Sequence, residues 1–104
     1  MSETSELTGP AIKAIKQCGV WATRMQAGRV KVRGGWMVLC PSGTPDILAR
    51  PQGRICWIET KIGKNGQTPE QIDFQRMSKE WGDEYYLCRS LDDVLSVLRT
   101  INLQ

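Results

Sequence analysis

The stretch that decides the fold reads SGTPDILARPQGRICWIETK, from Ser42 to Lys61. Two runs rich in β-forming residues, 47–50 and 54–61, flank the sequence Pro51-Gln52-Gly53. Proline and glycine are typical of a tight turn, so the stretch predicts a β-hairpin. We expect the second and third residues of that triplet to be the two central residues of the turn.

A two-residue turn fixes the register of this hairpin and pairs two acidic residues. Leu48 then lies opposite Trp57, and Asp46 lies opposite Glu59. Side chains directly opposite each other on neighbouring strands start roughly 5 Å apart. Because side chains alternate along a strand, Lys61 shares the face of Glu59. The pattern therefore predicts two carboxylates and one ammonium group converging on one face.

Two like charges placed opposite each other destabilise a sheet unless something neutralises them. Mg²⁺ and similar hard cations prefer oxygen ligands, which Asp46, Glu59 and the backbone carbonyl of Thr60 can supply. Lys61 would then orient a water molecule or stabilise the charge of a phosphoryl transition state. These residues indicate metal-assisted phosphodiester hydrolysis. The alternative is a solvated hairpin face with an ordinary surface salt bridge.

Three motifs in order resemble a known family: Gly43-x-Pro45-Asp46, Glu59-x-Lys61, and a helix opening Thr68-Pro69-Glu70-Gln71. They are similar to the PD-(D/E)XK nucleases and, more narrowly, to stand-alone VRR-NUC domains, the virus-type replication-repair nucleases. The resemblance extends from about Glu6 to Ser90. It implies an α/β, restriction-endonuclease-like α-β-β-β-α-β core with a mixed sheet and a C-terminal helix.

The resemblance also implies an activity. It suggests a deoxyribonuclease that depends on Mg²⁺ or Mn²⁺, without a nucleotide cofactor. Stand-alone relatives resemble Holliday-junction resolvases, so we expect a homodimer that acts on branched DNA, with a role in DNA repair. A flap or linear-duplex nuclease is one alternative, and a DNA-binding module that does not cut is another.

Further site residues follow from the resemblance. A glutamate of the first helix often completes the metal site in the family. Glu6 matches that glutamate best by its sequence separation from Gly19, and Glu3 is the second candidate. The family's helix-opening glutamine implies that Gln71 holds Lys61 or the attacking water. The competing interpretation is that Gln71 closes a capping box at the start of its helix.

Basic residues gather in the N-terminal part of the chain. Residues 1–64 carry ten Lys or Arg against four acids, whereas residues 65–104 carry four against seven. This asymmetry suits a polyanionic substrate, since phosphate contacts position a protein on nucleic acid without reading its sequence. Arg24 lies where the family has Arg-x-Asn-x-Gly, although Gln26 replaces the Asn. The candidate phosphate-binding residues are Arg24, Arg29, Lys31, Arg33 and Lys64.

Composition excludes several other chemistries. The chain has no histidine, so it lacks an imidazole base and a Ser-His-Asp triad. Its four cysteines show no paired spacing, which argues against zinc and disulfides. A length of 104 residues predicts one domain. Without an apolar run long enough for a membrane span or signal peptide, we expect a cytoplasmic protein, located in the host cytoplasm if virus-encoded.

The remaining segments support an order of α-β-β-β-α-β-α. We expect residues 1–7 to be flexible and a first helix from about Pro10, since proline suits a first turn. A proline there would clash with the carbonyl of Glu6 in a regular helix, so Glu6 should lie just ahead of the helix or at an irregular start. The other expected elements are strands at 20–26 and 85–89 and helices at 10–17, 69–81 and 91–98. Residues 24–35 form a basic, glycine-flanked segment, and the short apolar run 36–40 leads into the hairpin as part of a strand.

Overall fold

The computed structural model describes residues 5–102. In chain order, its elements are α1 (Ser5–Gln17), β1 (Ala22–Arg24), β2 (Arg29–Val32), β3 (Gly35–Val38), β4 (Ile47–Ala49), β5 (Cys56–Thr60), α2 (Pro69–Glu80), β6 (Glu84–Cys88) and α3 (Leu91–Asn102). Within the described residues, none of the helices is both long and apolar enough to cross a lipid bilayer.

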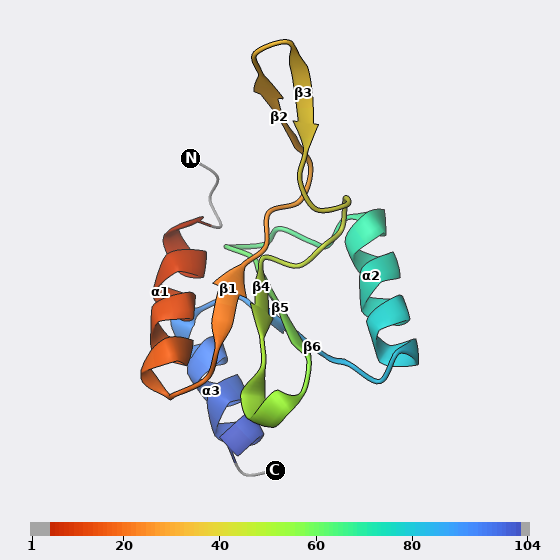
Figure 1. The fold of residues 1–104 in the computed structure, drawn as a ribbon. Helices are drawn as coiled ribbons and strands as arrows, with labels where there is room; N and C mark the ends of the chain where they lie inside the picture. The colour runs from red at the N-terminus through yellow and green to blue at the C-terminus, as the bar shows by residue number, and fades with distance from the viewer. Residues whose placement is uncertain (1–4, 103–104) are drawn as a thin grey trace.

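One four-stranded sheet organises the molecule, with the strand order β1-β4-β5-β6. The first three strands are antiparallel, and β6 joins parallel to β5 after the crossover through α2. Strands β2 and β3 pair only with each other within the described chain and project from the body as a separate ribbon (Figure 1). Apart from that ribbon, the predicted α/β order with a mixed sheet and a C-terminal helix is confirmed.

The β4–β5 hairpin has the predicted register. Leu48 pairs with Trp57, and Ile47 pairs with Ile58. At the turn, Gln52 has φ 52° and ψ 36° and Gly53 has φ 78°. Both central residues are therefore left-handed, as in the type I′ turns that match the twist of antiparallel strands.

The two faces of the sheet have different partners. Helices α1 and α3 cover one face, and α2 covers the other (Figure 1). The main core lies on the α1 and α3 side, and its members are Ala11, Ile15, Ala22, Ile47, Ala49, Cys56, Ile58, Cys88, Val94, Leu98 and Ile101. Because side chains alternate, the residues between these on β5, Trp57 and Glu59, face α2. Helix α2 packs there through Phe74, whose ring lies edge-on to the Trp57 ring with 4.9 Å between the ring centroids.

Helix α1 begins earlier than predicted. It starts at Ser5 and includes Pro10, whereas the sequence predicted a start near Pro10 and a flexible segment before it. For residues 5–9 the prediction was wrong, because it placed the proline at the first turn and took no account of tertiary contacts. Leu7 and Thr8 are buried, and Thr8 forms a hydrogen bond with β5, so tertiary contacts hold the first turn despite the lost backbone bond. Residues 1–4, including Glu3, lie outside the described part.

The basic segment also differs from the prediction. The sequence predicted a glycine-flanked loop followed by a strand leading into the main hairpin, but residues 29–38 form the β2–β3 ribbon. Gly34, with φ 90°, lies at its tip. The ribbon was missed because both of its strands are largely exposed, so neither shows a buried face in the sequence.

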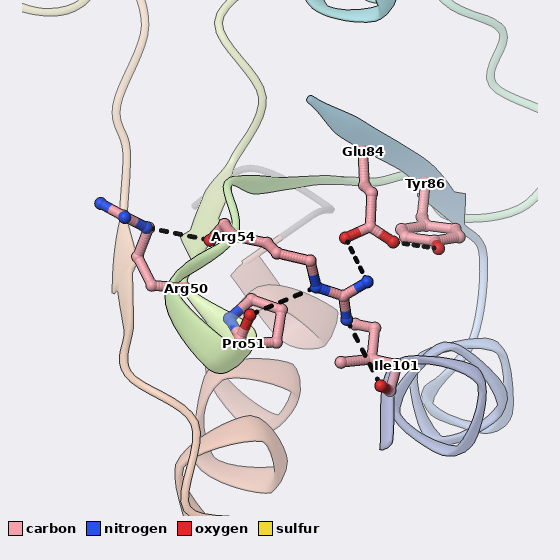
Figure 2. Close-up of polar contacts among 6 residues, drawn as sticks. All are labelled: Arg50, Pro51, Arg54, Glu84, Tyr86 and Ile101. Carbon is pink, nitrogen blue, oxygen red and sulfur yellow. Dashed lines mark hydrogen bonds and ion pairs between the residues drawn. The ribbon is translucent and has the colours of Figure 1, made fainter. Parts of the chain in front are cut away.

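Arg54 anchors the end of the sheet that carries the hairpin turn (Figure 2). Its guanidinium lies 3.3 Å from the Glu84 carboxylate and donates hydrogen bonds to the carbonyls of Pro51 and Ile101. A cation at the last turn of a helix also interacts favourably with the helix dipole. One side chain thus joins the turn, β6 and α3 at the end of the sheet opposite Asp46.

Gly43 fixes the loop before β4 against α2. It is buried with φ 91°, and a Cβ atom there would lie 2.4 Å from the backbone oxygen of Glu70. Such a separation is shorter than any van der Waals contact, so the loop can approach the helix only with glycine at this position.

The close approach at Gly43 predicts a large loss of stability for Gly43→Ala. Gly82 is the matched control, because its φ of 85° is equally left-handed but the surrounding structure leaves 4 Å of open space around the position that an added Cβ would take. We expect Gly82→Ala to cost about 1 kcal/mol. Gly43→Ala should cost about 1–3 kcal/mol more, because it adds steric overlap. Urea unfolding measures both values, and equal losses would contradict the assigned contact.

Candidate active site

Asp46 and Glu59 meet at the end of the β4–β5 hairpin, away from its turn. Glu59 is the fourth residue of β5 and is only 2% exposed. Asp46 directly precedes β4 and is half-buried. The two carboxyl groups lie within hydrogen-bonding range of each other. The hairpin register therefore brings together the two acids that the sequence pairs.

The pKa of Glu59 reflects this crowding. Burial raises it from its ordinary 4.5 to about 9, the hydrogen bond and charge of Asp46 act in the same direction, and Lys61 opposes the shift. A buried carboxyl group beside a second carboxylate keeps a proton at neutral pH because two adjacent negative charges in a poorly solvated place are costly. The pair thus needs one positive charge, from a proton or from a cation.

The donor set fits a hard divalent cation. Oε2 of Glu59 is buried, and no N–H or O–H group among the described residues donates to it, which leaves a proton shared with Asp46 or a cation to satisfy it. A buried polar atom without a partner is costly, and a cation that binds carboxylate oxygens would satisfy it. Within residues 5–102, no three His, Cys, Asp or Glu side chains lie close enough together to hold a metal. The pair would therefore be supplemented by backbone oxygen or water, as is common for Mg²⁺.

Thr60 fixes the Asp46 carboxylate. Oδ2 of Asp46 accepts hydrogen bonds from the Thr60 amide at 2.9 Å and from the Thr60 hydroxyl at 2.7 Å. The Thr60 hydroxyl also lies 2.7 Å from the hydroxyl of Thr8 on α1. Since Thr60 has a single hydroxyl proton and gives it to Asp46, Thr8 is the donor in this second bond. The first helix therefore orients a candidate ligand through two hydroxyl groups.

Lys61 follows β5 directly and is half-buried. Its backbone amide donates to the carbonyl of Cys88 at 3.0 Å, which extends the pairing of β5 and β6 to this residue. Its positive charge acts on Glu59, as the opposing effect on the pKa indicates. The ammonium group thus belongs to the same electrostatic site as the acids.

Tyr85 and Gln67 lie beside the acid pair and were not predicted. Burial is the main cause that raises the pKa of Tyr85 to about 12, and the negative charges of Glu59 and Asp46 contribute. Gln67 donates to the Tyr85 hydroxyl at 3.0 Å and to the Gln75 side chain at 3.1 Å. Sequence reasoning missed this group because it unites a loop, a helix and a strand without a common motif.

Gln71 caps α2. Its side-chain oxygen accepts from the Thr68 amide at 2.8 Å, and its own amide donates to the Thr68 hydroxyl at 3.2 Å. Of the two alternatives for Gln71, this is the capping box. A role at the attacking water would require the side chain to leave that box.

The other predicted site residues are exposed and lie on several different elements. Glu6 is in the first turn of α1, the helix that contributes Thr8. Arg24 pairs with Ile47 in the sheet, and its guanidinium lies near Gly9 of α1. Lys64 is in the loop after β5. The Arg89 guanidinium donates hydrogen bonds to two backbone carbonyls of that loop, those of Gly63 and Asn65. The remaining basic residues, Arg29, Lys31 and Arg33, lie on the β2–β3 ribbon and its tip.

The raised pKa of Glu59 predicts that stability falls with increasing pH when metal is absent. Between pH 4.5 and about 9 the folded protein keeps a proton that the unfolded chain releases. The free energy of unfolding should therefore decrease by at most about 1.4 kcal/mol per pH unit in this range. Glu59→Gln should remove most of this slope because it has no ionisable group.

Urea unfolding in EDTA at pH 5, 7 and 9 measures the slope. Glu70→Gln is the control because that carboxyl group is exposed, and it should keep the wild-type slope. A Glu59→Gln slope equal to that of the wild type would contradict the assignment of the proton to Glu59.

Comparison with known proteins gives a match in structure. No family model and no curated protein sequence matches the chain. A solved structure described as a VRR_NUC domain superposes with a TM-score of 0.70 at 18% sequence identity, covering 95% of this chain and 97% of that one. The chain therefore has the fold of a VRR_NUC domain over nearly its whole length, as the sequence motifs indicated.

Proposed function

We propose that this protein is a divalent-metal-dependent endonuclease of the VRR-NUC type that hydrolyses DNA phosphodiester bonds. The observation that carries the proposal is the buried carboxyl pair of Asp46 and Glu59, with an unpartnered oxygen on Glu59 and Lys61 adjacent. The similarity in fold to a VRR_NUC domain supports it, since nuclease chemistry is what that name describes. We assign the chemistry to the residues as follows.

Asp46 and Glu59 would hold Mg²⁺ or Mn²⁺, with the Thr60 carbonyl as a further candidate ligand. Glu6 does not form a three-carboxylate group with them in this structure, so it would become a ligand only if its side chain moved toward the pair. A bound divalent ion would polarise the scissile phosphate and favour deprotonation of water. Thr60 and Thr8 would keep the Asp46 carboxylate in one orientation, which lowers the cost of organising the site. Lys61 would orient the attacking water and stabilise the additional negative charge of the phosphoryl transition state.

DNA would reach this site across the basic N-terminal part of the chain. Arg24, which pairs with Ile47 in the sheet, and Lys64, in the loop after β5, would contact phosphates next to the cut. Arg29, Lys31 and Arg33 would contact phosphates farther away along the ribbon. Such contacts raise affinity and make it dependent on salt without selecting a sequence.

We extend the proposal to a homodimer that acts on branched DNA such as Holliday junctions. This extension depends on the resemblance to stand-alone VRR-NUC domains, because two symmetric cuts require two sites. A flap or linear-duplex nuclease would use the same acids and lysine, so the substrate must be identified by experiment.

Cleavage of a labelled four-way junction, beside matched flap and linear duplexes, tests the proposal. With Mg²⁺ or Mn²⁺ we expect paired symmetric cuts in the junction, and EDTA should abolish them. Asp46→Asn and Lys61→Ala should each reduce the cleavage rate at least about a hundredfold, because each removes charge that acts in the transition state.

Lys79→Ala is the matched control for Lys61→Ala, since Lys79 is an exposed lysine of α2 and the variant should cut like the wild type. A folded wild type that binds DNA but cuts none of the substrates would overturn the nuclease assignment. In that case the protein is a binding module, and Asp46→Asn should leave its DNA affinity unchanged or increase it.

A further inference from the structure

The β2–β3 ribbon is amphipathic. Cross-strand pairs share a face, and the pairs Arg29–Val38 and Lys31–Trp36 place two cations, an indole and a valine on one face. The pair Val30–Met37 and the side chain of Val32 occupy the other. The first face thus combines positive charge with an aromatic ring.

Trp36 is open to solvent on this face. It is 59% exposed, and the guanidinium of Arg29 lies 5.0 Å from the centre of its ring. A cation at that distance is attracted to the face of an indole and restrains it. The rest of the ring surface faces solvent on the β2–β3 ribbon and is not packed into the core. A solvent-exposed, restrained indole is suited to stacking with a flat ligand.

The surroundings of Trp36 select an anionic ligand. Between Glu6 and Asp46 the sequence contains no acidic residue and six basic ones. Three of them, Arg29, Lys31 and Arg33, lie on the ribbon or at its tip, whereas Lys13 and Lys16 lie on α1 and Arg24 lies on β1. A ring with cations on both sides along the ribbon matches a nucleotide strand, in which each flat base is attached to a phosphate.

The chain at the base of the ribbon is bonded to the backbone of Asp46. The amide of Met25 donates to the carbonyl of Asp46 at 2.7 Å, and the amide of Cys40 donates to the carbonyl of Gln26 at 2.8 Å. Trp36 is four residues from Cys40, which corresponds to roughly 13 Å along a strand. The ribbon thus leaves the body beside Asp46, and a nucleic-acid strand held at the acid pair could extend along the ribbon to Trp36 (Figure 1).

We propose that Trp36 is a stacking site for an unpaired base, with Arg29 and Lys31 holding the adjacent phosphates. This inference rests on the proposed function and adds a substrate feature to it: the protein would prefer DNA in which bases close to the cut are unpaired. Paired bases in a duplex stack on each other and do not offer a free face to the indole, whereas an unpaired base does.

Binding of two labelled DNA molecules in EDTA tests this inference. One is a fully paired duplex, and the other has the same ends with a central loop of unpaired thymidines. We expect the wild type to bind the looped DNA more tightly. Trp36→Leu, which keeps an apolar side chain on the ribbon, should lower affinity for the looped DNA about tenfold and leave the paired duplex nearly unchanged. Trp36→Phe should retain most of the preference.

Trp21→Leu is the matched control. Trp21 is also 59% exposed, but its carbonyl accepts from Arg50, which places it near the hairpin turn at the other end of the sheet. This variant should bind both DNA molecules like the wild type. If Trp36→Leu also binds like the wild type, or weakens both DNA molecules equally, the stacking site is overturned.

The outcomes separate this inference from the nuclease proposal, because binding in EDTA does not require cleavage. If the wild type cuts DNA but Trp36→Leu does not change DNA binding, the nuclease assignment stands and the stacking site is overturned. If the wild type prefers looped DNA through Trp36 but does not cut DNA with Mn²⁺, the stacking site stands and the nuclease assignment is overturned. If Trp36→Leu changes only the oligomeric state, the ribbon contacts a second copy of the chain, and stacking is overturned.

Discussion

The burial of Glu59 beside Asp46 is the constraint on which the rest of the site depends. The register of the β4–β5 hairpin places the two carboxyl groups together, and the sheet and α2 remove Glu59 from water. Such a pair is unfavourable unless a positive charge is shared between the acids. The fold tolerates this cost at the end of a rigid hairpin, which is where a divalent cation and a phosphate could be held in a fixed geometry.

The surrounding elements fix the pair from both faces of the sheet. On one face, Thr8 of α1 supports Thr60, which orients Asp46. On the other face, Gly43 allows the loop before β4 to contact the start of α2. The segment that leads from β1 to the ribbon is bonded to the same residue, because the amide of Met25 donates to the Asp46 carbonyl. Elements that are distant in sequence therefore converge on Asp46, while Arg54 stabilises the opposite end of the sheet.

The sequence predicted the parts of the fold that depend on local chemistry. The turn residues and the alternation of apolar side chains fixed the hairpin register, and the Thr68–Gln71 pattern predicted the start of α2. It failed where distant contacts decide the outcome. The start of α1 depends on a bond between Thr8 and Thr60, which are 52 residues apart. The proposed roles of Asp46, Glu59 and Lys61 come from the motifs, whereas the contacts of Thr8 and Tyr85 become visible only in three dimensions.

Calorimetric titration of Mn²⁺ into the wild type and into Asp46→Asn tests the central claim most directly. The substitution keeps the shape of the side chain and an oxygen that can accept from Thr60, and it removes only the charge. We predict that the wild type binds Mn²⁺ and that the folded variant binds it at least about tenfold more weakly, because a carboxylate is a far stronger ligand for a hard cation than an amide oxygen. Equal binding by both proteins, or no binding by the folded wild type, would contradict a metal site at the acid pair.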